Sequence, residues 1–197
     1  MKYDILVNKD NPIDENFKVD SLVSVGKHYS LANLLYTDHD VLLEETAAIF
    51  LKQFLIAANS INKDVLVIPN SGYRSYEYQV RVMNYYINLE GLEKAKERVA
   101  LPGTSEHHTG LAIDLSIFYK GNLLKNFNEA KDTINFIYSN AHVYGYILRF
   151  PRGKEKITGY YFEPWHFRFV GKELATYLYK NSITLEEYYL NKGMKKI

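Results

Sequence analysis

Two short stretches of this chain bring together the side chains that metal chemistry needs. In "GTSEHHTGLAIDL", His107 and His108 stand seven and six residues before Asp114, and in "EPWH", Glu163 stands three residues before His166. The aspartate interrupts an apolar run that otherwise reads as a buried strand, and a buried carboxylate without a partner is costly. Catalytic zinc takes three protein ligands of these kinds and keeps one position open. The pattern therefore predicts a divalent-metal site.

The residues alone leave the ligand set open. The helical H-E-x-x-H arrangement is absent, so the ligands must come from separate strands and loops. With no cysteine in the chain, thiolate ligands are excluded. The candidates are His107 or His108, Asp114, Glu163 and His166. His108 and Asp114 would share one face of an uninterrupted strand, whereas Gly110 is expected to break that strand. The alternative is a metal-free buried polar network in which Asp114 pairs with an arginine.

The elements that must position these residues predict an α+β fold, with helices packed around a small antiparallel sheet. We expect a helix over residues 37–62, a strand from residue 64 that ends near Pro69 to Gly72, two helical pieces over 76–99 broken near Gly91, a loop over 101–110, a strand over 111–119, a helix over 128–145, strands over 146–150 and 160–171, and a terminal helix opened by a capping box at Thr184 to Glu187.

The bulk composition fits one globular domain, which we expect to span residues 1–197. A formal net charge of +1 argues against a nucleic-acid partner, because such proteins concentrate positive charge. No run has the length of a membrane span, and the N-terminus lacks the apolar core of a signal peptide. As it stands, the sequence predicts a cytoplasmic protein; an extracytoplasmic one is expected if a leader was removed.

Four segments carry a resemblance to a known family. "SGYRSYEYQ", "PGTSEHHTGLAIDL", "GYILRFP" and "ITGYYFEPWHFRFVG" resemble the signature segments of zinc D-Ala-D-Ala carboxypeptidases of the VanY kind, most nearly the VanXY-type D,D-dipeptidase/D,D-carboxypeptidases. The S-x-H-x-x-G-x-A-x-D pattern is met by Ser105, His107, Gly110, Ala112 and Asp114. The resemblance covers nearly the whole chain and implies the fold that these peptidases share with the hedgehog signalling domain.

The resemblance also implies roles for particular residues. His107, Asp114 and His166 are the implied zinc ligands, and Glu163 is the implied general base, which leaves His108 outside the ligand set. Zinc lowers the pKa of its water, so that a nearby carboxylate can take the proton.

Three further residues have implied roles toward the substrate. Arg74 is the implied cation for the oxyanion of the tetrahedral intermediate, with a salt bridge to Glu77 as the alternative. Ser105 and Gln79 are the implied contacts to a terminal D-alanine. Their alternatives are a hydroxyl that orders the loop and an exposed helix residue.

We therefore expect a zinc-dependent D-alanyl-D-alanine carboxypeptidase that acts on peptidoglycan precursor peptides ending in D-Ala, with D-Ala-D-Ala dipeptidase activity as a second activity. One alternative is an L,D-carboxypeptidase that acts on muropeptide tetrapeptides. Another is a non-catalytic zinc-containing module that binds cell-wall peptides, although the presence of Glu163 and Arg74 favours an enzyme. The sequence leaves the oligomeric state open.

Overall fold

The computed structural model describes residues 3–26 and 40–193. Its strands are β1 (Leu22–Ser24), β2 (Leu42–Glu44), β3 (Val65–Ser71), β4 (Ala112–Tyr119), β5 (Asn122–Leu123), β6 (Tyr146–Leu148) and β7 (His166–Phe169). Its α-helices are α1 (Glu45–Asn59), α2 (Tyr76–Glu90), α3 (Leu92–Arg98), α4 (Lys131–Asn140), α5 (Glu155–Thr158), α6 (Lys172–Asn181) and α7 (Leu185–Asn191). Three 3-10 helices complete the set: η1 (Glu106–Thr109), η2 (Phe127–Ala130) and η3 (Ala141–Tyr144).

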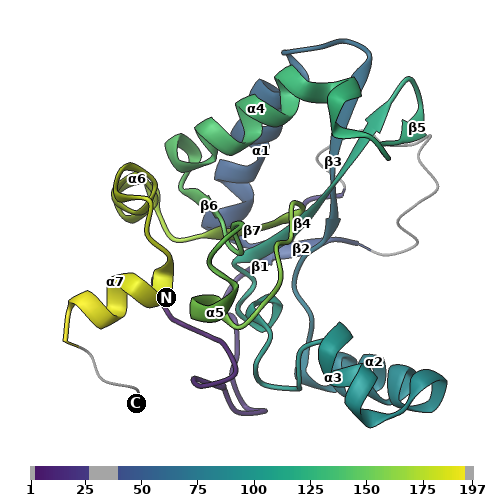
Figure 1. Ribbon diagram of the computed structural model, residues 1–197, viewed down its shortest axis with the longest axis vertical. Helices are drawn as coiled ribbons and strands as arrows, with labels where there is room; N and C mark the ends of the chain where they lie inside the picture. The colour runs from purple at the N-terminus through teal and green to yellow at the C-terminus, as the bar shows by residue number, and fades with distance from the viewer. Residues whose placement is uncertain (1–2, 27–39, 194–197) are drawn as a thin grey trace.

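The described residues form two antiparallel sheets with helices around them, which confirms the predicted α+β fold. The larger sheet has the order β3-β4-β7-β6, with β5 paired to β4, and β1 pairs with β2 in the smaller one. Figure 1 shows α1 and α4 together on one side of the larger sheet, while α2 and α3 project away from it as a separate arm. None of the helices in the described ranges combines the length and hydropathy that a membrane crossing needs.

The two faces of the larger sheet differ in kind because side chains alternate along a strand. Ile113 of β4, with Phe167 and Phe169 of β7, belongs to the main hydrophobic core, which α1 and α4 help to form. The residues between them point to the opposite face. Asp114 is paired in register with His166, so these two side chains lie next to each other on the face away from the core.

The predicted start of the first helix is wrong. Leu42–Glu44 forms β2, and α1 begins only at Glu45, because the Glu44 carboxylate caps the helix by accepting the N–H of Ala47. Leu43 is fully buried opposite Val23 of β1, so this segment pairs as a strand instead of extending the helix. Residues 37–39 of the predicted helix lie outside the described residues.

Other boundaries shift as well. The strand predicted over 160–171 is only β7, and Pro164, which has no N–H to donate, lies in the irregular approach to it. The helix predicted over 128–145 is α4 with a 3-10 turn at each end, and η1 occupies part of the predicted loop over 101–110. The strand from residue 65 runs through Pro69 to Ser71, with a register shift between these two residues.

Several predictions are confirmed. The helical pieces over 76–99 are α2 and α3, separated at Gly91, and the capping box of Thr184 and Glu187 opens α7. Four elements of the structure were not predicted from the sequence: β1, β5, α5 and α6.

Candidate active site

Three elements bring the predicted ligands to one point. Asp114 and His166 are neighbours in the β4–β7 pairing, and η1 adds His107 from the turn that precedes β4. Each of the three residues offers a ligand atom within 4.8 Å of the other two. Gly110 ends η1 in the left-handed conformation, at φ +68°, so the turn can close directly before the strand begins.

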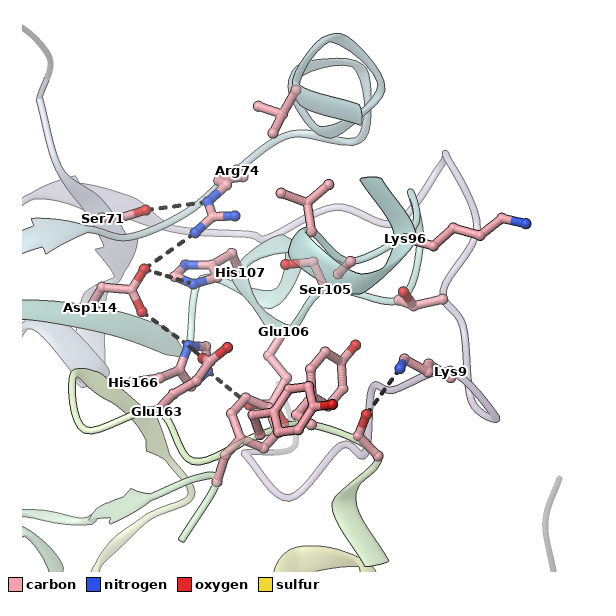
Figure 2. A pocket seen from close by; sticks show the side chains of 18 of the residues that line it. Lys9, Ser71, Arg74, Lys96, Ser105, Glu106, His107, Asp114, Glu163 and His166 are labelled. Carbon is pink, nitrogen blue, oxygen red and sulfur yellow. Dashed lines mark hydrogen bonds and ion pairs between the residues drawn. The ribbon is translucent and has the colours of Figure 1, made fainter. Parts of the chain in front are cut away.

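The carboxylate of Asp114 lies between the two rings. Its Oδ2 is 3.4 Å from Nε2 of His107, and its Oδ1 is 3.0 Å from Nδ1 of His166. The rings are 5.0 Å apart and nearly perpendicular. Figure 2 shows these side chains facing a common centre at the edge of the sheet. Both histidines are buried, so few water molecules compete for their ring nitrogens.

The ring nitrogens that point away from this centre also have partners. Nδ1 of His107 donates to the carbonyl oxygen of Gly72 at 2.6 Å, and Nε2 of His166 lies 3.4 Å from Oε2 of Glu106. Gly72 is required at its position because an added Cβ would lie 2.2 Å from the carbonyl oxygen of Leu42. Both outer nitrogens face acceptors, which leaves the inner nitrogens for the shared centre.

Burial and charge set different protonation states for the two rings. Burial, reinforced by the charge of Arg74, lowers the pKa of His107 to about 4. Burial alone would also lower the pKa of His166, but its hydrogen bonds to Asp114 and Glu106 outweigh that effect and raise it to about 9. The pKa of Asp114 lies well below its usual range, because the two histidines outweigh the effect of its burial. In the metal-free protein, a proton on His166 thus serves as the counter-charge of Asp114.

Arg74 extends over the same centre from the loop between β3 and α2. Its Nη2 is 3.3 Å from Oδ2 of Asp114, its Nε donates to the hydroxyl of Ser71 and its Nη1 to Oε1 of Gln79. Among the described residues, the ion pair of Arg74 is with Asp114 and not with Glu77, the alternative considered from the sequence. The guanidinium is therefore held at the centre and not drawn away along the helix.

The side chain of His108 points in a different direction from that of His107. Its Nε2 accepts the N–H of Gly103, so its Nδ1 must carry the proton and donates it to the carbonyl oxygen of Arg74 at 2.7 Å. The backbone N–H of Arg74 donates in turn to the carbonyl oxygen of His107. His108 is buried, lies outside the ligand cluster and fixes the loop that carries Arg74.

Glu163 lies on the solvent side of the cluster. Its Oε2 is 3.7 Å from Nδ1 of His166, and its side chain keeps 29% of its exposure. Burial raises the pKa of this carboxyl above its ordinary value, although His166 acts in the opposite direction. A carboxyl with these properties can exchange a proton with a molecule in the cleft.

A cleft of about 1210 Å³ opens over these residues. Its wall includes Ser105, Tyr78 and Tyr85 of α2, and Trp165. Gln79 is fully buried instead of being an exposed helix residue, because its amide nitrogen donates to the carbonyl oxygen of Ala100 while its oxygen accepts from Arg74. The cleft has room for a ligand larger than a dipeptide.

A buried ion network that was not predicted from the sequence lies behind His166. Oε1 of Glu106 accepts hydrogen bonds from Arg149 at 2.8 Å and Arg168 at 2.7 Å, and Arg149 also forms a bidentate pair with Glu186. All four side chains are buried. The sequence did contain a signal for this network: in "HFRF", ionisable residues alternate with apolar ones along a strand.

The donor set fits a divalent cation of the zinc type. Two imidazoles and one carboxylate face one centre, the outer ring nitrogens of the two imidazoles face protein acceptors, and a cleft gives access to the centre. Three protein ligands with an accessible fourth position is the arrangement of catalytic zinc sites.

Comparison with known proteins agrees with this geometry. The family VanY, D-alanyl-D-alanine carboxypeptidase, matches residues 40–172. The protein YodJ of Bacillus subtilis is 38% identical over 193 residues, which are 98% of this chain and 68% of YodJ. The bifunctional D-Ala-D-Ala dipeptidase and D-Ala-D-Ala carboxypeptidase VanXYC of Enterococcus gallinarum is 35% identical, over 93% of this chain and 92% of VanXYC.

Solved structures give the same result. The LD-carboxypeptidase LdcB superposes with a TM-score of 0.78 at 36% identity, over 98% of this chain and 86% of LdcB. A variant of the vancomycin-resistance D,D-pentapeptidase VanY, in complex with Zn(II), superposes with a TM-score of 0.74 at 30% identity, over 95% of this chain and 99% of VanY. Sequence, fold and site thus agree, and the chain belongs to the VanY family of D-alanyl-D-alanine carboxypeptidases.

Proposed function

We propose that this chain is a zinc-dependent D,D-carboxypeptidase that removes the C-terminal D-Ala from peptidoglycan precursor peptides. The observation that carries the proposal is the convergence of His107, Asp114 and His166 on one point beneath an open cleft, with Glu163 beside them. The zinc complex of VanY and the two D-Ala-D-Ala activities in the name of VanXYC support it.

His107, Asp114 and His166 would hold the zinc through Nε2, a carboxylate oxygen and Nδ1. Bound zinc would supply Lewis-acid chemistry, which activates water and polarises a peptide carbonyl. Glu163 takes the proton from the attacking water, because its carboxylate is next to the centre and its pKa is raised by burial. It then gives this proton to the amine nitrogen of the departing D-Ala.

Arg74 stabilises the negative charge that develops on the carbonyl oxygen, because its guanidinium is fixed beside the centre before the reaction begins. Ser105 lines the cleft and is the proposed partner of the terminal carboxylate of the substrate. Gln79 belongs to the same proposed substrate site through Arg74, whose guanidinium it holds.

We also propose that residues 1–197 form one catalytic domain. The segment near Leu6 packs in the same hydrophobic cluster as Ile183 and Tyr189, near the other end of the described chain. Contacts between such distant parts of the sequence indicate a single folding unit.

A specific observation favours a second candidate. LdcB, named an LD-carboxypeptidase, superposes with the TM-score of 0.78 over 98% of the chain. An L,D-carboxypeptidase that removes D-Ala from a tetrapeptide would use the same catalytic groups with different contacts in the cleft.

Product analysis separates these activities. The purified protein is incubated with a pentapeptide ending in D-Ala-D-Ala, with the tetrapeptide and with free D-Ala-D-Ala, and the products are weighed by mass spectrometry. Loss of one alanine from the pentapeptide alone supports the D,D-carboxypeptidase. Loss from the tetrapeptide alone supports the L,D-activity, and cleavage of the free dipeptide adds the dipeptidase.

The metal is tested separately by elemental analysis of protein purified without added metal. We expect close to one zinc per chain, and a loss of activity after chelation that zinc restores. Less than about 0.2 zinc per chain without activation by added zinc would contradict the zinc assignment.

A further inference from the structure

A buried carboxylate lies directly behind one of the proposed ligands. Glu106 is 3% exposed, and its Oε2 is 3.4 Å from Nε2 of His166, while Nδ1 of the same ring faces Asp114 at 3.0 Å. The two carboxylates therefore lie at the two different nitrogens of one imidazole ring, with Glu106 on the side away from the ligand cluster (Figure 2).

The other carboxylate oxygen of Glu106 is bound by arginines. Oε1 accepts from Arg149 and Arg168, and Arg149 also pairs with Glu186. Two carboxylates and two guanidiniums make this buried network neutral without counting His166. Glu106 can therefore remain a carboxylate beside a neutral imidazole, and its Oε2 is left to accept the Nε2–H.

Fold stability alone does not account for a network of this kind at this place. Buried ion pairs are often no more stabilising than apolar residues of the same volume, because the charges must be stripped of water. This network ends at the imidazole ring of His166. The orientation of that ring matters, because a histidine can present only one of its two nitrogens to a given centre. His107 has the same arrangement with a different acceptor, the carbonyl oxygen of Gly72.

We propose that Glu106 is a positioning residue for His166: it accepts the Nε2–H and so holds the ring with Nδ1 toward the centre that His107 and Asp114 share. This inference rests on the proposed function, because it concerns the histidine as a metal ligand. The two arginines hold Glu106 in place, and Glu106 acts through His166, outside the set of proposed ligands.

Glu106→Gln and Glu186→Gln form a matched pair of variants. Each removes one negative charge from the same buried network, but only Glu106 contacts His166. The dissociation constant for Zn²⁺ alone is measured by competition with a chromophoric chelator. We expect Glu106→Gln to weaken zinc binding by roughly 10- to 100-fold, and Glu186→Gln to change it by less than about threefold.

Equal losses in the two variants would overturn the proposal, because they would reflect the charge of the network and not the contact to the ring. Unchanged zinc binding in Glu106→Gln would overturn it too, while leaving the proposed function intact. A parent protein that binds no zinc would overturn the proposed function, and this inference with it.

A second measurement needs no variant and so does not depend on whether Glu106→Gln folds. Long-range proton–nitrogen NMR spectra of the zinc-loaded parent protein report which ring nitrogen of His166 carries hydrogen. We expect a proton on Nε2, in slow exchange with water and close to Glu106. A proton on Nδ1, with Nε2 toward the metal, would overturn the proposal.

Discussion

The two sides of the cleft are built differently. On the sheet side, Ile113 is fully buried and every residue of β7 is buried, so Asp114 and His166 lie on closely packed strands, and His107 lies on η1 directly before β4. On the other side, α2 buries only Gln79 and Met83 and leaves Tyr85 and Leu89 more than 60% exposed. Figure 1 shows this arm of α2 and α3 standing apart from the sheet.

This difference indicates that the two sides of the cleft have different roles. Groups that must keep a fixed geometry lie where the backbone is paired and the side chains are enclosed. The arm contributes an exposed aromatic surface along the cleft, including Tyr78 and Tyr85, which suits contact with the more distant part of a substrate. Substitutions on the sheet side should therefore affect the chemistry, and substitutions on the exposed face of the arm should affect it little.

The largest expected effect is on the sheet side, at Glu163. Glu163→Gln removes the proposed base and should lower kcat by roughly 10²- to 10⁴-fold. Because this side chain is partly exposed, the variant should still fold. Glu93→Gln on the arm is the control: its carboxylate also lines the cleft but pairs with Lys96 at the surface, so activity should stay within about threefold. The measurement is the steady-state rate of each variant on the preferred peptide. Comparable losses of activity in both variants would contradict the proposed difference between the two sides of the cleft.

Arg74 lies where the two sides join. Arg74→Lys keeps the charge but loses the planar contacts to Asp114 and Ser71, so we expect a loss of about 2.7–4 kcal/mol of transition-state stabilisation, with kcat reduced more than KM is raised. Arg81→Lys, on the arm, serves as the comparison and should leave kcat nearly unchanged. A rise in KM alone for Arg74→Lys would indicate substrate binding instead of oxyanion stabilisation.

The sheet side should also make stability depend on pH in the metal-free protein. The pKa of His166 rises from 6.5 to about 9 on folding, so its contribution is complete below pH 6.5 and is lost as the pH rises through 9, on the order of 3 kcal/mol. The pKa of His107 falls to about 4, so stability is also lost as the pH falls from 6.5 toward 4. Urea unfolding followed by circular dichroism should show maximum stability near pH 6.5.

Bound zinc would replace the proton on the inner nitrogen of each ring, so both histidines stay neutral with one proton on the outer nitrogen, and the loss on the alkaline side should disappear in the zinc-loaded protein. A free energy of unfolding that keeps rising from pH 6.5 to 9 without metal would contradict the assigned protonation of His166.

The smallest effect is expected on the exposed face of the arm. Leu89→Gln should change the free energy of unfolding by no more than about 0.5 kcal/mol, because the side chain is 64% exposed. Met83→Ala, on the buried face of the same helix, should cost about 2–5 kcal/mol. Thermal or urea unfolding of both variants measures this contrast, and similar losses would mean that the outer face of α2 is covered in solution.

Local patterns predicted much of the fold and the site. The alternation of "LAIDLSIFY" indicated a strand with Asp114 on it, and the capping box at Thr184 marked the start of α7. The motif spacing and the family resemblance indicated His107, Asp114 and His166, which the structure brings together. These signals are readable because periodicity, capping and turn chemistry depend on residues only a few positions apart.

The tertiary structure determined the features that depend on contacts between residues far apart in the sequence. Leu42–Glu44 became β2 because β1 lies beside it, and the choice between His107 and His108 depended on the Gly72 carbonyl and on the backbone of Arg74, more than 30 residues away. The salt bridges of Glu106 span 43 and 62 residues of sequence to reach Arg149 and Arg168. A sequence shows which side chains can ionise or donate, but the partner of a buried charge is fixed only when the chain folds and removes water from around it.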